Sequence, residues 1–226
     1  MTMDLHLFST PGPGFDITWV LEACKQVLDG KREATIAYLP QASLAAEKWL
    51  KETQRAFRDT ARIEMIDTET MQLAEMEGVL RRAALVYIPG GNAFLLNHRL
   101  HGSHVAPYLK KKVQNGLPAV AFSAGVVVCG PNVLTSNDLN LVPTMHFDGL
   151  GLTPFNFNVH YADTTERDDW LVEYHSFHDN PVIMLEDGAY VRIAGKTTAL
   201  VRGDAWCWRA GRDKVRLAPG EAIAVN

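Results

Sequence analysis

The feature of this sequence that most restricts its fold is a set of short apolar runs separated by segments with helical spacing. The clearest run, residues 83–88, reads Ala-Ala-Leu-Val-Tyr-Ile, and residues 117–122 form a second one. Strands that are apolar at every position are typical of a parallel sheet that is buried on both faces. The alternation therefore predicts an α/β fold, with a mainly parallel sheet flanked by helices on both faces.

The expected elements follow from the periodicity of apolar residues and from glycine and proline positions. We expect strands over residues 5–8, 34–39, 62–66 and 83–88, and helices over residues 15–28, 44–57 and 68–78, the last ending at Gly78. Beyond residue 180, short antiparallel strands are expected as a tail or sheet extension, over residues 182–185, 189–193, 198–201, 206–208 and 222–225. The length of 226 residues predicts a single domain over residues 1–226.

Composition excludes several classes of protein. The chain has 22 basic and 26 acidic residues, a net charge of -4, which is unlike a nucleic-acid-binding protein. Its three cysteines form no Cys-x-x-Cys pair, so a zinc site or a disulfide framework is not expected. The sequence contains neither a signal-peptide pattern nor 18 consecutive apolar residues. These features predict a cytoplasmic protein without a nucleic-acid or membrane partner.

Residues 120–125, Val-Ala-Phe-Ser-Ala-Gly, predict a strand that ends in a sharp turn and leads into a helix. Such a turn exposes the Ser123 hydroxyl at the edge of the sheet, and small neighbours are needed because the backbone is crowded there. The N–H groups at the start of the helix favour a developing negative charge. Ser123 is therefore a candidate nucleophile, and the alternative is an ordinary helix-capping serine.

A glycine turn, Gly90-Gly91-Asn92, follows the clearest apolar run. Two glycines allow backbone N–H groups to approach a ligand, and Asn92 can either cap the next helix or donate a hydrogen bond to a substrate. This arrangement fits an oxyanion hole, although an ordinary turn has the same sequence. A phosphate-binding loop is disfavoured because the pattern lacks the glycine and lysine spacing of such loops.

A serine nucleophile needs a base, and the sequence offers eight histidines. His160 and His146 are the two best candidates, and strand-like residues around His160 favour it. An imidazole can exchange a proton near neutral pH, which suits a general base. His98, His101 and His104 lack an acidic partner nearby, which disfavours a metal site.

Five blocks in the same order, spread over about residues 80–200, resemble peptidase E, the α-aspartyl dipeptidases, a group of serine peptidases. The blocks are Gly90-Gly91-Asn92-Ala93-Phe94, Phe122-Ser123-Ala124-Gly125, Thr135-Ser136-Asn137-Asp138, Asp148-Gly149-Leu150-Gly151-Leu152-Thr153-Pro154-Phe155 and Asn158-Val159-His160-Tyr161. The resemblance implies a class I glutamine-amidotransferase-like, flavodoxin-like fold. It also implies that Ser123 attacks the scissile carbonyl, that His160 transfers its proton, and that Gly91 and Ala124 provide oxyanion-hole N–H groups.

The resemblance leaves two assignments open. The acid of the triad would come from Glu186 or Asp187, which point apart on a strand, and we favour Asp187 because it directly precedes a glycine. The family's substrates carry an N-terminal aspartate, and Arg167 is the arginine that best matches the family's carboxylate-binding position. The alternative for Arg167 is a surface ion pair with Glu166 or Asp169.

The sequence departs from the family pattern at four places. Ala93 replaces a threonine, Val159 replaces a proline, the acid would be an aspartate, and the segment after His160 diverges. The resemblance thus predicts a serine exopeptidase that hydrolyses dipeptides or short aspartyl compounds with an N-terminal aspartate and needs neither a cofactor nor a metal ion. The alternatives are a divergent acyl or isopeptide hydrolase, similar to cyanophycinases, and an inactive binding module. The oligomeric state is not predicted.

Overall fold

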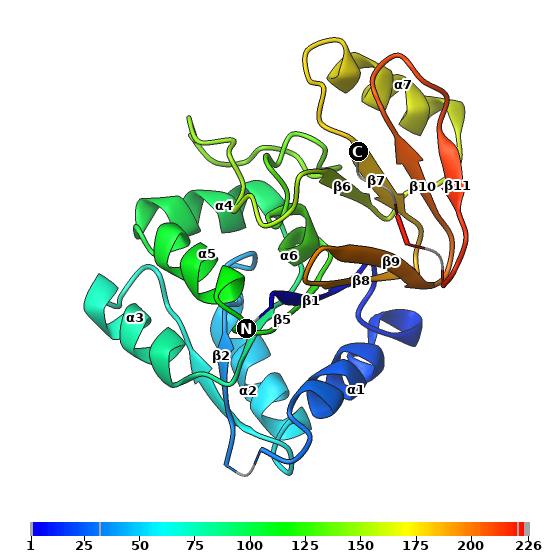
Figure 1. Ribbon diagram of the computed structural model, residues 1–226. Coiled ribbons are helices and arrows are strands. Elements are labelled where there is room, and N and C mark those ends of the chain that lie inside the picture. The colour runs from blue at the N-terminus through cyan, green and yellow to red at the C-terminus, as the bar shows by residue number, and fades with distance from the viewer. Residues whose placement is uncertain (1, 32, 221, 224–226) are drawn as a thin grey trace.

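The computed structural model describes residues 2–31, 33–220 and 222–223. Its main sheet has seven strands in the order β3-β2-β4-β5-β1-β8-β9 (Figure 1). Their bounds are β1 (Asp4–Phe8), β2 (Thr35–Tyr38), β3 (Arg62–Met65), β4 (Leu85–Ile88), β5 (Ala119–Phe122), β8 (Tyr190–Ala194) and β9 (Thr197–Arg202). The first five strands are parallel, and β8 and β9 extend the sheet in antiparallel fashion. The predicted α/β class is confirmed.

Helices cover both faces of this sheet (Figure 1). They are η1 (Pro13–Phe15), α1 (Thr18–Val27), α2 (Ala46–Ala56), α3 (Leu73–Arg82), α4 (Ala93–Gly102), α5 (Ala106–Gln114) and α6 (Ala124–Val127). Helix α7 (Thr165–His175) lies away from this sheet and packs against Val182 and Met184. Strand β4 shows how the two faces arise, because successive side chains point to opposite sides. Its Val86 and Ile88 pack with α3, α4 and α5, whereas Leu85 and Tyr87 pack with α1 and α2. All four side chains are buried, which explains the continuous apolar run.

A second sheet of four strands has the order β11-β10-β7-β6. Its strands are β6 (Asn156–Val159), β7 (Val182–Leu185), β10 (Ala205–Trp208) and β11 (Val215–Leu217). Leu171 and Tyr174 of α7 pack against Val182 and Met184 of this sheet. The C-terminal strands predicted as a tail are therefore divided between the two sheets. Of the strand predicted over residues 222–225, Ala222 forms an isolated bridge, and residues 224–225 lie outside the described part of the chain.

The prediction was wrong at α3, which begins and ends later than residues 68–78. The residues before the helix form a turn in which the Asp67 carboxylate accepts hydrogen bonds from Glu69 and Thr70. The helix begins after Gln72, where a capping box fixes its N-terminus, and it continues through Gly78 to Arg82. Glycine is unfavourable inside a helix but does not end it when neighbouring residues pack well. Among the described residues, we find no helix with the length and apolar character needed to cross a membrane.

Candidate active site

Ser123 lies at the sharp turn between β5 and α6, at the carboxyl end of the main sheet. Its φ of 51° and ψ of -119° are rare for a residue other than glycine. The Ser123 N–H donates to the Phe8 carbonyl oxygen at 3.0 Å, at the end of the neighbouring strand β1. Strained backbone of this kind persists only where the surroundings hold it, and it is concentrated at functional sites.

Close contacts at two glycines hold this turn in place. A Cβ added to Gly125 would lie 2.2 Å from the carbonyl oxygen of Ile88, and one added to Gly90 would lie 2.9 Å from the Ser123 Cβ. Both distances are shorter than the closest approach of a Cβ atom to an atom that is not bonded to it. The small residues that predicted the turn are therefore required by the approach of β4 to the start of α6.

His160 follows β6 of the second sheet and lies beside Ser123. Its Nε2 is 2.8 Å from the Ser123 Oγ, and its Nδ1 is 2.6 Å from Oδ1 of Asp187. Asp187 follows β7, the strand paired with β6. The side chains of His160 and Asp187 are 31% and 58% exposed, so the carboxylate end of this hydrogen-bonded chain faces solvent. The structure thus brings together the three residues that the sequence grouped.

Glu186 does not take part in this chain of hydrogen bonds. Burial raises the pKa of its carboxyl group, and the nearby carboxylates of Asp204 and Asp163 raise it further. The Glu186 N–H donates to the Asp204 carbonyl oxygen at 3.1 Å. Of the two neighbouring acids left open by the sequence, the structure pairs Asp187 with His160.

A short segment after β1, Ser9 and Thr10, contacts the parts of the site around His160 and Asp187, and these contacts were not predicted from the sequence. Ser9 Oγ accepts a hydrogen bond from the His160 N–H at 3.0 Å and donates to the Leu185 carbonyl oxygen at 3.1 Å. Thr10 Oγ1 accepts from the Gly188 N–H at 2.9 Å, next to Asp187. Serine and threonine after a strand carry no distinctive signal, because their partners are more than 150 residues away.

Two backbone N–H groups near Ser123 are available to a ligand. In residues 2–31, 33–220 and 222–223, the N–H groups of Gly91 and Ala124 donate to no protein acceptor. Gly91 has a φ of 139°, and an added Cβ would lie 2.3 Å from the Ala42 carbonyl oxygen, so only glycine fits. Free N–H groups beside a serine hydroxyl are the donors that an oxyanion hole needs.

Asn92 caps helix α4. Its Oδ1 accepts from the Leu95 N–H and its Nδ2 donates to the Leu139 carbonyl oxygen, both at 2.9 Å. The capping role, one of the two sequence interpretations, is thus present. The substrate-binding role stays a prediction.

The block Thr135-Ser136-Asn137-Asp138 joins the glycine turn to the strand that precedes His160. The Asp138 Oδ2 accepts from the Ala93 N–H at 2.7 Å, at the start of α4. The Asn137 Nδ2 donates to the Val159 carbonyl oxygen at 2.6 Å, one residue before His160. This block therefore connects the main sheet to the second sheet at the site.

Arg167 lies in the first turn of α7 and is partly buried. Across the described residues, its guanidinium forms no hydrogen bond or ion pair, so the surface pair with Glu166 or Asp169 is not seen. Its neighbour Asp168 is engaged, because its Oδ1 accepts from the Tyr161 hydroxyl at 2.7 Å. The carboxylate-binding role of Arg167 stays a prediction.

Lys214, which precedes β11, holds the segment after His160. Its Nζ donates to the Tyr161 hydroxyl at 2.9 Å and pairs with both Asp163 and Asp168. A hydrogen bond from Lys214 lowers the pKa of the Asp163 carboxyl group. The charge of Lys214 is thus balanced within the protein.

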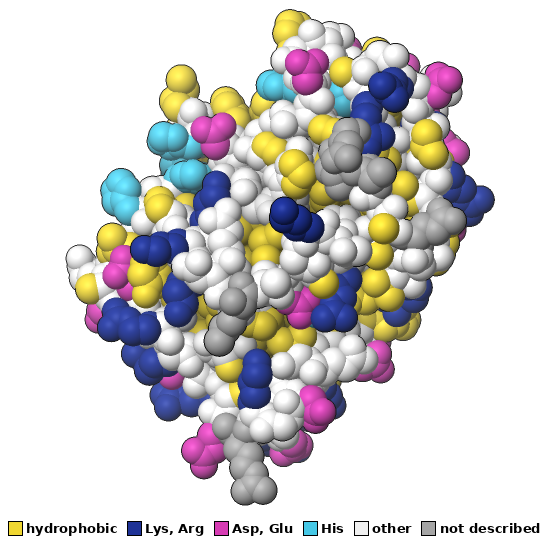
Figure 2. All heavy atoms as spheres, viewed as in Figure 1, with side chains coloured by type: hydrophobic (Ala, Val, Ile, Leu, Met, Phe, Trp, Pro, Cys, Tyr) yellow, Lys and Arg dark blue, Asp and Glu magenta, His cyan; other side chains and the backbone are white. Residues whose placement is uncertain are grey.

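Several of the other histidines lie close together on the surface. Figure 2 shows histidine side chains gathered on the surface near α4, and the rings of His101 and His146 stack with their centroids 5.7 Å apart. The described residues contain no group of three or more histidine, cysteine or acidic side chains that could hold a metal ion. A surface hollow of about 480 Å³ beside α7 and β10 shares no described lining residue with the Ser123 site.

The model of a family described as Peptidase family S51 matches residues 16–201. The chain belongs to this family. It is therefore a peptidase, and the resemblance to peptidase E that the sequence motifs indicated is confirmed.

Named relatives of this S51 peptidase agree with that assignment. It is 30% identical over 197 residues to a Drosophila melanogaster protein named "Probable alpha-aspartyl dipeptidase", covering 82% of this chain and 80% of the relative. It is 27% identical over 209 residues to "Peptidase E" of a Nostoc species, covering 86% and 84%. The crystal structure of a peptidase from an acI-B1 Actinobacterium matches with a TM-score of 0.75 at 18% identity, over 99% of this chain and 97% of that one. At that identity the structural match supports the fold alone.

Proposed function

We propose that this S51 peptidase is a serine exopeptidase that cleaves dipeptides or short aspartyl compounds with an N-terminal aspartate. The observation that carries the proposal is the hydrogen-bonded chain from Ser123 through His160 to Asp187. A hydroxyl bonded to an imidazole that is itself oriented by a carboxylate is the arrangement of a Ser-His-acid triad. The triad here draws its nucleophile from the main sheet and its base and acid from the second sheet.

The reaction follows from the positions of these groups. His160 Nε2 accepts the Ser123 proton while Oγ attacks the scissile carbonyl carbon, and the N–H groups of Gly91 and Ala124 stabilise the resulting oxyanion. When the tetrahedral intermediate collapses, the C–N bond breaks and the leaving amine takes the proton from Nε2. A water molecule, deprotonated by His160, then hydrolyses the acyl-serine ester and restores the Ser123 hydroxyl. Asp187 holds Nδ1–H throughout and stabilises the imidazolium.

The preference for N-terminal aspartate rests on the relative from Drosophila and on one residue of this chain. That relative carries the name alpha-aspartyl dipeptidase. In this chain Arg167 is seven residues after His160 and has no partner among the described residues, whereas Lys214 is neutralised by two aspartates. A guanidinium binds a carboxylate through two parallel hydrogen bonds. We therefore assign the aspartate side chain of the substrate to Arg167.

The test is hydrolysis of Asp-Leu, Glu-Leu and Leu-Leu in the presence of EDTA. The proposal predicts cleavage of Asp-Leu alone, a loss of that activity in Ser123→Ala, and no effect of EDTA. Arg167→Gln should raise KM for Asp-Leu, because it removes a charge-assisted pair, while Arg81→Gln on the exposed part of α3 serves as the matched control. Equal cleavage of Leu-Leu and Asp-Leu would contradict the aspartyl preference. Full activity in Ser123→Ala would contradict the serine mechanism.

A further inference from the structure

A cavity of about 390 Å³ lies at the carboxyl edge of the main sheet, on the face covered by α1 and α2. Aromatic side chains dominate its walls, and those that matter here are Phe15, Tyr38, Trp49, Tyr87 and Phe122. Its volume lies within the range of roughly 300–1,000 Å³ that is usual for small-molecule sites.

The walls of this cavity carry no ionised side chain among the described residues. Burial raises the pKa of Tyr38 to about 12 and holds the pKa of Tyr87 well above its usual range, so both phenols stay neutral. A carboxylate or ammonium group placed here would lose its hydration without gaining a partner of opposite charge, which is strongly unfavourable. The cavity therefore favours an apolar occupant.

The cavity adjoins the reacting groups on two sides. Gly90 and Gly91 form part of its wall, and Gly91 is also an oxyanion-hole donor in the proposed mechanism. Phe15, another wall residue, has its ring centroid 6.0 Å from that of His160. Because His160 must hand its proton to the leaving amine, the residue after the scissile bond lies on the His160 side of the site.

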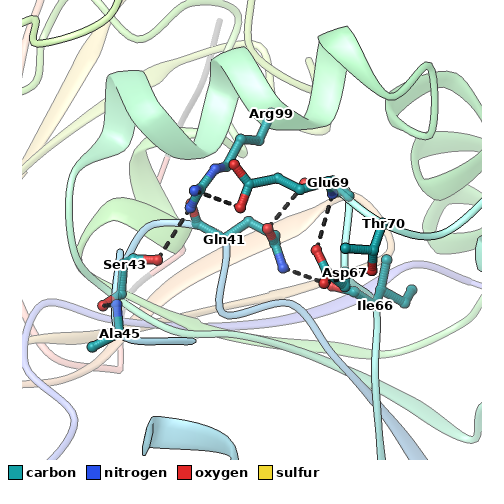
Figure 3. A network of polar contacts seen from close by, with 9 residues as sticks. Gln41, Ser43, Ala45, Ile66, Asp67, Glu69, Thr70 and Arg99 are labelled. Atoms are coloured by element: carbon teal, nitrogen blue, oxygen red, sulfur yellow. Dashed lines mark hydrogen bonds and ion pairs between the residues drawn. The ribbon is translucent and has the colours of Figure 1, made fainter. Parts of the chain in front are cut away.

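One wall of the cavity is held by a network of hydrogen bonds and an ion pair formed within the protein itself (Figure 3). Arg99 of α4 donates from Nη1 to the carbonyl oxygens of Gln41 and Ser43, at 3.0 and 3.1 Å, and its Nη2 pairs with Glu69 at 2.8 Å. The Gln41 side chain donates to the Ile66 carbonyl oxygen at 2.8 Å. The segment that includes wall residue Ser43 is thus fixed before binding, which reduces the entropy lost when a ligand binds.

The same segment is hydrogen-bonded to the glycine turn, Gly90-Gly91-Asn92. The carbonyl oxygen of Ala42 accepts from the Asn92 N–H at 2.9 Å, and Ala42 itself lines the cavity. A ligand that fills the cavity therefore contacts the backbone that positions Gly91.

We infer that this cavity is the subsite for the residue after the scissile bond, and that it selects a large apolar side chain such as leucine or phenylalanine. The inference rests on the proposed function, which places an aspartate before the scissile bond. That carboxylate cannot occupy an uncharged aromatic cavity, so the apolar side chain of the other residue fills it. The direction of the substrate agrees with the contact between Phe15 and His160.

The first measurement compares kcat/KM of the wild-type enzyme for Asp-Phe, Asp-Leu, Asp-Ala and Asp-Lys. Removing a methylene at an apolar subsite lowers kcat/KM roughly 10–200-fold, and a charge placed there loses its hydration without gaining a partner. We expect Asp-Phe and Asp-Leu to exceed Asp-Ala by at least about 10-fold, with Asp-Lys the poorest substrate. Equal values for all four would overturn the subsite and leave the aspartyl peptidase intact.

Two variants locate the effect in the cavity. Trp49, which is 44% exposed at its rim, is changed to alanine, and Trp170 of α7, which is 53% exposed and does not line the cavity, is changed in the same way. Trp49→Ala should reduce the ratio of Asp-Phe to Asp-Ala cleavage about fivefold or more, since it removes apolar contact area. Trp170→Ala should leave this ratio unchanged. An unchanged ratio in both variants would contradict the assignment.

Binding of the free amino acid distinguishes failure of the subsite from failure of the proposed function. L-phenylalanine should bind to the Ser123→Ala protein in calorimetry, L-lysine should not, and the additional change Trp49→Ala should weaken phenylalanine binding about fivefold. If no aspartyl dipeptide is cleaved but this pattern appears, the function is wrong and the apolar selectivity of the cavity is right. If phenylalanine does not bind, or lysine binds equally well, the subsite is wrong. Cleavage that depends on an apolar residue before the scissile bond would also overturn it.

Discussion

The two halves of the candidate site are held in different ways. On the main sheet, the turn at Ser123 is held by close contacts in which Gly125 fits against the Ile88 carbonyl group. On the second sheet, the backbone around His160 and Asp187 is held by hydrogen bonds to side chains: Ser9 Oγ accepts from the His160 N–H, and Thr10 Oγ1 accepts from the Gly188 N–H. Steric contacts demand particular small residues, whereas hydrogen bonds can be supplied by several polar residues from many places in the chain.

This difference predicts how each half responds to substitution. Changes on the nucleophile side should disturb folding and activity together, because the turn is part of the packed core. Changes on the base side should reduce activity with a limited cost in stability, because Asp187 is exposed and His160 is partly exposed.

Apart from changes to Ser123 and His160 themselves, the largest effect is expected for Asp187→Asn. An amide cannot stabilise the imidazolium and favours the wrong tautomer of His160, so kcat should fall about 10³- to 10⁴-fold. The matched control is Glu186→Gln, which changes the neighbouring acid and should keep more than half of the activity. Steady-state kinetics on Asp-Leu measures both. Equal losses in the two variants would contradict the separation of roles between these neighbouring acids.

Gly125→Ala tests the half of the site on the main sheet, where close contacts hold the Ser123 turn. The new methyl group would lie 2.2 Å from the Ile88 carbonyl oxygen, so the backbone must shift and unfolding should become easier by about 1–3 kcal/mol. The control Gly102→Ala places a methyl group at a position with no atom within 4 Å and should change stability by less than about 0.5 kcal/mol. Urea denaturation gives both values. Similar stability of the two variants would show that the turn is not held by this contact.

Thr10→Val tests the half of the site on the second sheet, where hydrogen bonds hold the backbone around His160 and Asp187. It leaves the Gly188 N–H without its acceptor, so it should cost about 1–2 kcal/mol and displace Asp187, lowering kcat about 10-fold with little change in KM. Thr153→Val removes a comparable buried hydrogen bond, to the Phe155 carbonyl oxygen, away from the site. Both variants should lose similar stability, as measured by urea denaturation. If Thr153→Val lowered kcat equally, Thr10 would have no positioning role.

The smallest effect concerns pH and Glu186. The pKa of Glu186 is raised in the folded protein by burial and by neighbouring carboxylates. Protonated Glu186 is therefore favoured on folding, and this contribution is lost as the pH rises through its folded pKa. Glu186→Gln should give a slightly higher Tm than wild type at pH 7, with the difference shrinking towards pH 4. A lower Tm for the variant at pH 7 would contradict the sign of this shift.

The two ways in which the halves of the site are held also explain which features could be predicted from the sequence. The parallel sheet was predictable because successive residues such as Leu85 and Val86, which point to opposite faces of the sheet, are both apolar. The turn at Ser123 was predictable because the close contacts there require small residues within the turn itself. The second sheet was not predicted, since β6, β7, β10 and β11 are short strands whose pairing depends on contacts distant in sequence.

At the site, the sequence grouped Ser123, His160 and Asp187 through the resemblance to a family and not through spacing. The roles of Ser9 and Thr10 were not predicted, because no local sequence pattern identifies the partner of a polar residue that follows a strand. The aromatic cavity was also missed, because its walls come from four strand ends and a helix that are separated by up to about 110 residues. Arg167 remains a prediction from the family pattern.

The central claim is that the two sheets contribute to one catalytic unit, and a double-mutant comparison tests it most directly. We would measure kcat/KM for Asp-Leu with Ser123→Ala, His160→Gln and the double variant. Residues that act as a unit are not additive, so each single change should cost about 10⁴- to 10⁶-fold and the double variant should be no slower than either one. If the two losses multiplied, or if either single variant kept its activity, Ser123 and His160 would not form a catalytic pair.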